Sequence, residues 1–87
     1  MPRVLIYCTA ACPYCQAADR LLDRKGVIDI ERVRVDLEPG RRAEMQQKSG
    51  RRTVPQIWIG GRHVGGSDEL HDLEESGALD RLLAKAT

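Results

Sequence analysis

The sequence contains no phenylalanine, one tryptophan and two tyrosines among its 87 residues. The core must therefore be mainly aliphatic, built from valine, leucine, isoleucine and alanine. A formal net charge of only +1 gives no electrostatic reason to expect nucleic acid as a partner. No apolar run is long enough to cross a bilayer, so we expect no membrane partner either. A chain of this length fits a single domain over residues 1–87.

Cysteine is scarce too, and its count of three is odd. A small secreted domain held together by disulfides would need an even and larger number. The apolar stretch at residues 4–8 is too short for a signal peptide and indicates a buried strand instead. We therefore expect a cytoplasmic protein whose cysteines serve chemistry rather than stability.

Strand-like and helix-like patterns alternate along the chain. Apolar or alternating stretches predict strands at Val4–Cys8, Ile30–Asp36, Val54–Ile59 and Arg62–Gly65. Apolar residues at three- and four-residue steps predict helices from Pro13 to Gly26, over Arg41–Ser49 with Ala43 and Met45 as apolar anchors, and from an N-cap at Ser67 onward with an interruption at Gly77.

The order of these elements predicts the fold class. The first strand–helix–strand unit implies two parallel strands with a right-handed crossover. Gly60-Gly61 predicts an antiparallel hairpin. The order β-α-β-α-β-β-α therefore predicts an α/β fold with a mixed four-stranded sheet, in which Ile30–Asp36 is an edge strand and helices flank both faces.

The strongest chemical signal is Cys12-Pro13-Tyr14-Cys15, at the predicted junction of the first strand and the first helix. The spacing of three brings both sulfurs to one helical turn, close enough to form a disulfide. The unsatisfied N–H groups and the dipole of the helix N-terminus favour the thiolate of Cys12, which is the reactive form. Cys15 lies one turn further in, so we expect it to stay protonated.

A metal site is the competing interpretation of the cysteine pair. Structural zinc takes four ligands, usually from two such pairs. The sequence has no second pair, and His63 and His71 stand alone far along the chain. A C-x-x-C beside a strand–helix–strand pattern is typical of a redox motif, so we expect a redox-active Cys12–Cys15 disulfide and no metal.

Three motifs together resemble the glutaredoxin family, most closely the short bacterial dithiol type called glutaredoxin 3. They are Cys12-Pro13-Tyr14-Cys15, Thr53-Val54-Pro55-Gln56-Ile57-Trp58-Ile59 and Gly65-Gly66-Ser67-Asp68-Glu69-Leu70. The resemblance spans nearly the whole chain. It implies a thioredoxin fold, and glutathione as co-substrate with no tightly bound cofactor.

The resemblance also implies where glutathione binds. Pro55 would be cis, and the backbone of Val54 would pair with glutathione as an added strand. Ser67 and Asp68 would open a helix that receives the γ-glutamyl end, and Arg42 would hold the glycine carboxylate. The implied glutathione-binding residues are Tyr14, Arg42, Thr53, Val54, Pro55, Gly66, Ser67 and Asp68.

The sequence departs from the family pattern at one position. Most such glutaredoxins have a lysine three residues before the first active cysteine, where this chain has Thr9. No ammonium group in this loop can stabilise the thiolate or reach the glutathione carboxylate. We therefore expect a less stabilised Cys12 thiolate and weaker glutathione binding than in lysine-bearing relatives.

These observations predict a monomeric, glutathione-dependent thiol–disulfide oxidoreductase. Its partners would be glutathione, protein disulfides and glutathionylated proteins, with Cys12 and Cys15 as the catalytic residues. One alternative is a redoxin reduced by thioredoxin reductase. Another is a protein that binds an iron–sulfur cluster through Cys12 and glutathione.

The remaining conspicuous residues have ordinary structural interpretations. Cys8 is expected to pack as a small core residue, although a regulatory disulfide with Cys12 or Cys15 stays open. Trp58 is expected in the core. His63 and His71 are expected at the surface, together with the basic residues Arg41, Lys48, Arg51 and Arg52.

Overall fold

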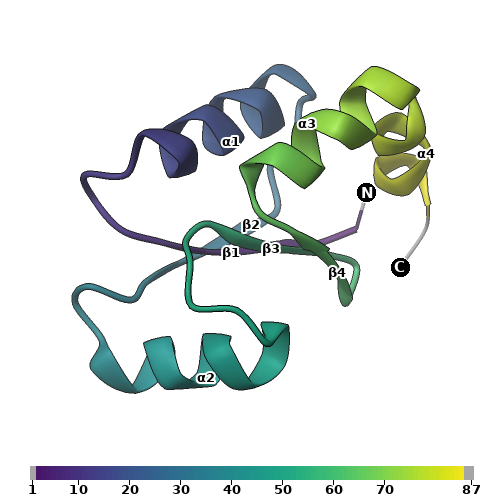
Figure 1. The fold of residues 1–87 in the computed structure, drawn as a ribbon. Coiled ribbons are helices and arrows are strands. Elements are labelled where there is room, and N and C mark those ends of the chain that lie inside the picture. Colours follow the sequence, from purple (N-terminus) through teal and green to yellow (C-terminus); the bar gives the residue numbers. More distant parts are fainter. Residues whose placement is uncertain (1, 86–87) are drawn as a thin grey trace.

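The computed structural model describes residues 2–85. Figure 1 shows the chain folded into a sheet with helices on either side. The elements in chain order are β1 (Val4–Cys8), α1 (Pro13–Arg24), β2 (Ile30–Arg34), α2 (Pro39–Ser49), β3 (Gln56–Ile59), β4 (Arg62–Gly65), α3 (Ser67–Ser76) and α4 (Ala78–Ala84). None of the helices in this described part is long and apolar enough to cross a membrane.

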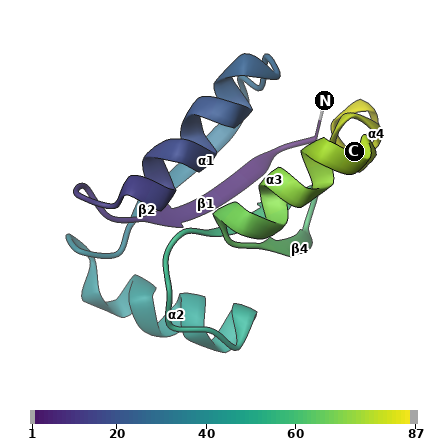
Figure 2. The same ribbon diagram turned by 45° about the horizontal axis from the view of Figure 1, so that its top comes forward.

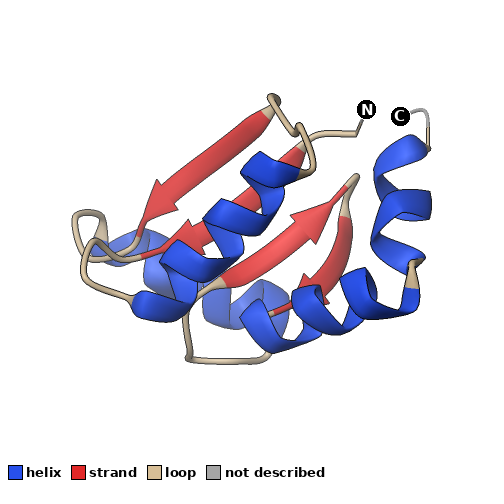
Figure 3. Cartoon of the chain, turned by 90° about the horizontal axis from the view of Figure 1, so that it is seen from above, coloured by secondary structure: helices blue, strands red, loops and turns tan. Residues whose placement is uncertain are grey.

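The sheet is mixed and has the order β2-β1-β3-β4. Strand β1 pairs with β2 in parallel and with β3 antiparallel, and β4 returns antiparallel beside β3. Figure 3 shows the resulting strand directions from above. The predicted α/β class, the edge position of β2 and the hairpin at residues 60–61 are confirmed.

Helices cover both faces of the sheet, which explains why β1 is apolar along its whole length. α1, α3 and α4 lie on one face and α2 lies on the other (Figures 1 and 2). Val4 and Ile6 of β1 belong to an aliphatic core, whereas Tyr7 belongs to a second cluster on the α2 side. Because alternate residues of a strand face opposite sides, one short strand contributes to both cores.

The second cluster contains the sequence's aromatic residues outside the cysteine motif. Tyr7 is fully buried and meets Trp58 edge-on, with ring centroids 5.3 Å apart. Met45 is the buried residue of α2. Ala43 is exposed, so the expectation that it anchors α2 is wrong, and Met45 supplies the apolar contact. Trp58 is buried, as predicted.

Helix boundaries differ from the predicted ones at the starts of α2 and α3. α2 begins at Pro39, two residues before the predicted Arg41, because proline is favoured in the first turn of a helix. α3 begins at Ser67, but its N-cap is Gly66 rather than Ser67. The cause is Glu69, whose side chain accepts the Gly66 backbone N–H at 2.8 Å. At the other end Gly77, with φ of 82°, adopts a left-handed conformation that ends α3 and starts a separate helix, α4, so the predicted interruption at Gly77 is confirmed.

Cys8 is half-buried and packs against the aliphatic core. Its sulfur lies 3.7 Å from the Val33 carbonyl of the neighbouring strand β2, and all three cysteines are free thiols in this structure. The prediction that Cys8 is a small packing residue agrees with these contacts.

Candidate active site

The sulfur of Cys12 lies at the N-terminus of α1. Cys12 is the N-cap of the helix, and its Sγ accepts the backbone N–H of Cys15 at 3.3 Å. On its other side the Sγ lies 3.7 Å from the backbone carbonyl of Val54. The half-buried Cys12 thiol is therefore placed between a helix end, which favours the thiolate, and the loop before β3.

The second cysteine of the pair has a different environment. Cys15 is only 5% exposed. Burial of the thiol, together with its side-chain interaction with Cys12, raises the pKa of Cys15 to about 12. A thiol with that pKa stays protonated at neutral pH, so Cys12 is the sulfur available as a nucleophile.

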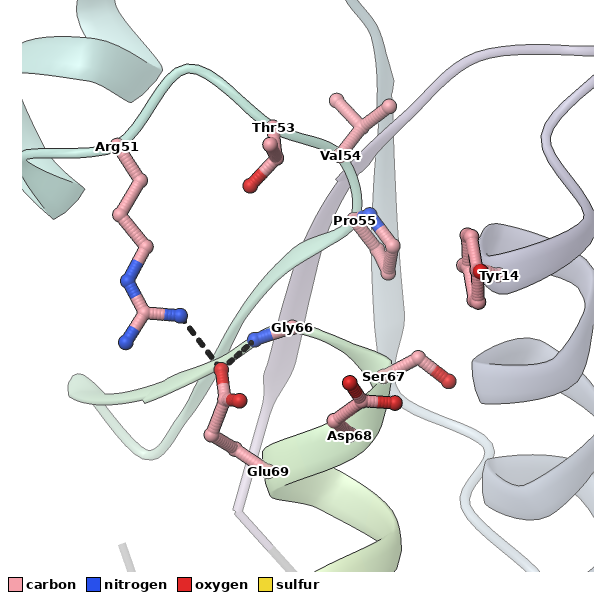
Figure 4. Close-up of a pocket in the computed structure, with 9 residues that line it drawn as sticks. All are labelled: Tyr14, Arg51, Thr53, Val54, Pro55, Gly66, Ser67, Asp68 and Glu69. Atoms are coloured by element: carbon pink, nitrogen blue, oxygen red, sulfur yellow. Dashed lines mark hydrogen bonds and ion pairs between the residues drawn. The ribbon is translucent and has the colours of Figure 1, made fainter.

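A groove with a volume of about 250 Å³ lies beside the cysteine pair. Figure 4 shows the residues that line it, which come from α1, the loop before β3 and the start of α3. They are Tyr14, Arg51, Thr53, Val54, Pro55, Gly66, Ser67, Asp68 and Glu69. The structure thus brings together every expected glutathione-binding residue except Arg42.

Two features of this groove match the sequence-based expectations closely. The Val54–Pro55 peptide bond is cis, as predicted. Tyr14 is 65% exposed and lines the groove rather than the core. Arg42 is on α2, and its Nη1 donates to the backbone carbonyl of Arg52 at 3.4 Å.

Two residues that line the groove, Arg51 and Glu69, were not among the expected glutathione-binding residues. One oxygen of Glu69, Oε1, accepts both the Gly66 N–H at 2.8 Å and Arg51 Nη1 at 2.5 Å. Both hydrogen bonds lower the pKa of Glu69 below its usual range, and the bond from the Gly66 N–H has the larger effect. The signal was present for Glu69, because an acidic residue three positions after a helix N-cap is typical of a capping box.

The groove contains groups that complement a ligand with both a positive and a negative charge. Arg51 brings a guanidinium, and the first-turn N–H groups of α3 favour an anion. Asp68 is exposed at the groove and brings a carboxylate that suits an ammonium group. Thr9 lies elsewhere, in a small separate cavity that Cys8 and Cys15 also line.

Comparison with known proteins identifies the family. The family model for glutaredoxin matches residues 4–64 of this chain. The chain belongs to the glutaredoxin family. A glutaredoxin of Pseudomonas aeruginosa is 57% identical over 84 residues, which is 97% of this chain and 99% of that protein. Glutaredoxin 3 of Escherichia coli is 46% identical over 83 residues, 95% of this chain and 99% of the relative.

Solved structures of glutaredoxins share the fold. The solution structure of glutaredoxin from Brucella melitensis matches with a TM-score of 0.83 and 47% identity, covering all of this chain and 96% of that one. A buckwheat glutaredoxin–glutathione complex matches with a TM-score of 0.87 and 29% identity, over 94% of this chain and 76% of that one. The chain therefore has the thioredoxin fold implied by its motifs, and its family is one of glutathione-related thiol oxidoreductases.

Proposed function

We propose that this protein reduces glutathione mixed disulfides and protein disulfides with glutathione as the reductant. The observation that carries the proposal is the unequal environment of the two cysteines. Cys12 Sγ lies at the helix N-terminus beside the groove, whereas Cys15 is buried with its pKa raised to about 12. The Cys12 sulfur is thus suited to nucleophilic attack on a disulfide, whereas the Cys15 sulfur stays protonated during that attack.

In the first half-reaction the Cys12 thiolate attacks the glutathione sulfur of a mixed disulfide. A Cys12–glutathione disulfide forms, and the substrate leaves as a thiolate that takes a proton from water. A second glutathione thiolate then attacks the bound glutathione sulfur, which releases oxidised glutathione and restores the Cys12 thiolate. A sulfur stabilised as thiolate is a good leaving group, so its position at the α1 N-terminus favours this second step.

Protein disulfides follow a route that also uses Cys15. Cys12 attacks one sulfur of the substrate disulfide and forms a mixed disulfide with the protein. Cys15 then attacks Cys12 Sγ and breaks the bond between Cys12 and the substrate sulfur. The proton of Cys15 passes to the departing substrate thiolate, so that the substrate leaves fully reduced and Cys12–Cys15 is oxidised. Two glutathione molecules restore the dithiol and leave as oxidised glutathione.

Glutathione would lie along the groove with its cysteine towards Cys12. The Val54 backbone would pair with the peptide in the manner of an added strand. The γ-glutamyl end, with its ammonium and carboxylate, suits Asp68 and the N–H groups that open α3. Arg51, which lines the groove, would supply a guanidinium group for the glycine carboxylate. Arg42 lies on α2 outside the groove lining, and it would reach this carboxylate only by turning from the Arg52 carbonyl.

We also propose that the protein works as a monomer in the cytoplasm. The half-reactions above need one chain and a pool of reduced glutathione. A small and odd number of cysteines is typical of a protein that works in such a reducing compartment.

The dependence on glutathione is tested by supplying the protein with one reductant at a time. Turnover of a glutathione mixed disulfide is measured with glutathione plus glutathione reductase, and separately with thioredoxin reductase alone. We expect turnover with glutathione only, and reduction by thioredoxin reductase alone would overturn the proposal. Anaerobically purified protein is expected to show no visible absorbance; a cluster spectrum would favour the iron–sulfur alternative.

A further inference from the structure

A chain of hydrogen bonds runs behind the groove from β4 to Thr53. Its centre is Gln56, the first residue of β3, whose side chain is fully buried. Gln56 Nε2 lies 3.0 Å from the backbone carbonyl of Thr53 and 3.3 Å from Thr53 Oγ1. Gln56 Oε1 lies 2.8 Å from His63 Nε2. His63 was expected at the surface, but it is half-buried here.

The partners of Gln56 fix where the hydrogens lie. A backbone carbonyl can only accept, so the amide nitrogen of Gln56 must face Thr53 and its oxygen must face His63. His63 therefore carries its hydrogen on Nε2. Burial is the main cause that lowers the pKa of His63, so the ring is neutral at pH 7 and Nε2–H is its one donor.

The position of His63 is itself restricted. Its ring lies against Trp58, with centroids 4.6 Å apart. Trp58 is 6% exposed and its cross-strand neighbour is His63. The imidazole is thus held between the indole and the Gln56 amide. Because this packing restricts the rotamers of His63, its Nε2–H stays directed towards Gln56.

These hydrogen bonds determine how the Thr53 hydroxyl is oriented. Thr53 Oγ1 accepts a hydrogen from Gln56, so the hydrogen of its own hydroxyl is left for another acceptor. Thr53 lines the groove beside Val54 and Pro55 (Figure 4). The chain from His63 through Gln56 therefore leaves Thr53 as a donor towards whatever lies in the groove.

We propose that His63 and Gln56 are positioning residues that hold Thr53 as a hydrogen-bond donor to a carbonyl or carboxylate oxygen of the ligand. The inference rests on the proposed function, in which that ligand is glutathione. Neither residue touches the ligand. They act on glutathione binding and leave the sulfur chemistry of Cys12 unaltered.

The test compares variants that keep volume but remove or restore a donor. His63→Leu and Gln56→Met each break the chain, and we expect the KM for glutathione to rise about five-fold in each, the worth of one hydrogen bond. The kcat should stay within about two-fold, because Cys12 is unaltered. His63→Gln places an amide N–H near the lost Nε2–H, so its KM should return close to that of the wild type.

Thr53→Val separates positioning from loss of stability. This substitution removes the hydroxyl that the His63–Gln56 hydrogen bonds orient. Gln56→Met should therefore raise the KM for glutathione only slightly when Thr53 is already valine. Denaturant titration of each variant checks that the fold persists. Additive effects of the two substitutions, or equal KM values for His63→Leu and wild type, would overturn the inference.

The same measurements keep the two proposals apart. If the wild type turns over with glutathione and the variants match it, the positioning role is wrong and the proposed function stands. If the wild type itself neither turns over nor binds glutathione, both fail. If kcat falls in His63→Leu while KM stays unchanged, and His63→Gln does not restore kcat, His63 has only a structural role.

Discussion

Arg51 and Glu69 form an ion pair of 2.5 Å that joins the two walls of the groove. Arg51 belongs to the loop before β3, and Glu69 belongs to the first turn of α3. The Glu69 oxygen in this pair also accepts the N–H of Gly66. A single carboxylate thus holds the start of α3 against the loop that carries the cis peptide bond (Figure 4).

Acid should weaken this contact. The Gly66 N–H and then Arg51 lower the pKa of Glu69 from its ordinary 4.5. A carboxylate with a lowered pKa stabilises the folded state above its ordinary pKa, and the contribution disappears as the pH falls through the lowered value. Glu69→Gln should therefore be less stable than wild type at pH 7 by about 0.5–1 kcal/mol, because the pair is partly exposed, and the difference should vanish in acid.

The measurement is the free energy of unfolding in denaturant between pH 7 and pH 3. Glu75→Gln, on the exposed side of the same helix, is the matched control. A constant offset between wild type and Glu69→Gln across this range would contradict the role given to Glu69.

The three cysteines should react with an alkylating agent in a fixed order. Burial raises the pKa of both Cys8 and Cys15, the latter to about 12. Cys12 should therefore be labelled first in the reduced native protein at pH 7, as peptide mapping would show. In denatured protein the three rates should become similar. Labelling of Cys8 or Cys15 as fast as Cys12 in native protein would refute this assignment.

Gly65 should tolerate no side chain. Its φ of 119° is one that residues with a Cβ rarely adopt, and a Cβ there would collide with the Glu69 carboxylate. Gly65→Ala should destabilise the protein by about 1–3 kcal/mol and weaken glutathione binding by displacing Glu69. Gly40→Ala is the control: it lies in α2 with open space around it, and should be neutral or slightly stabilising. Thermal unfolding of both variants would show whether the two glycines differ in this way.

Thr9→Lys should increase the reactivity of Cys12. The chain has no ammonium in the loop at residues 9–11, and a cation three residues before Cys12 would favour the Cys12 thiolate. We expect the rate of Cys12 alkylation at pH 7 to rise about two- to five-fold at low salt, and less at high ionic strength. Thr9→Gln, with a neutral side chain, should leave the rate unchanged. An equal increase in both variants would exclude an effect of charge.

Local sequence patterns predicted much of the fold. The apolar run of β1, the glycines of the hairpin and the cysteine pair at a helix start each specify their own geometry within a few residues. The N-cap of α3 was misplaced by one residue because both Gly66 and Ser67 are good N-cap residues. Only the Glu69 side chain on the Gly66 N–H decides between them.

The contacts that sequence reasoning missed join residues that are distant along the chain. Arg51 and Glu69 are separated by 18 positions, and β3 and β4 lie between them in the sequence. His63 could have been placed from sequence, since a two-residue hairpin loop sets it opposite Trp58. What the register could not show is that the imidazole reaches the buried Gln56.

In the proposed reaction Cys12 is the one sulfur that forms a disulfide with glutathione. The deciding measurement is the intact mass and peptide map of the Cys15→Ser protein after reaction with oxidised glutathione, followed by addition of reduced glutathione. We expect one glutathionyl group on Cys12, its removal by reduced glutathione, and retained turnover of glutathione mixed disulfides. Cys12→Ser should show no turnover. A stable glutathionyl group on Cys8, or turnover by the Cys12→Ser protein, would show that Cys12 is not the nucleophile.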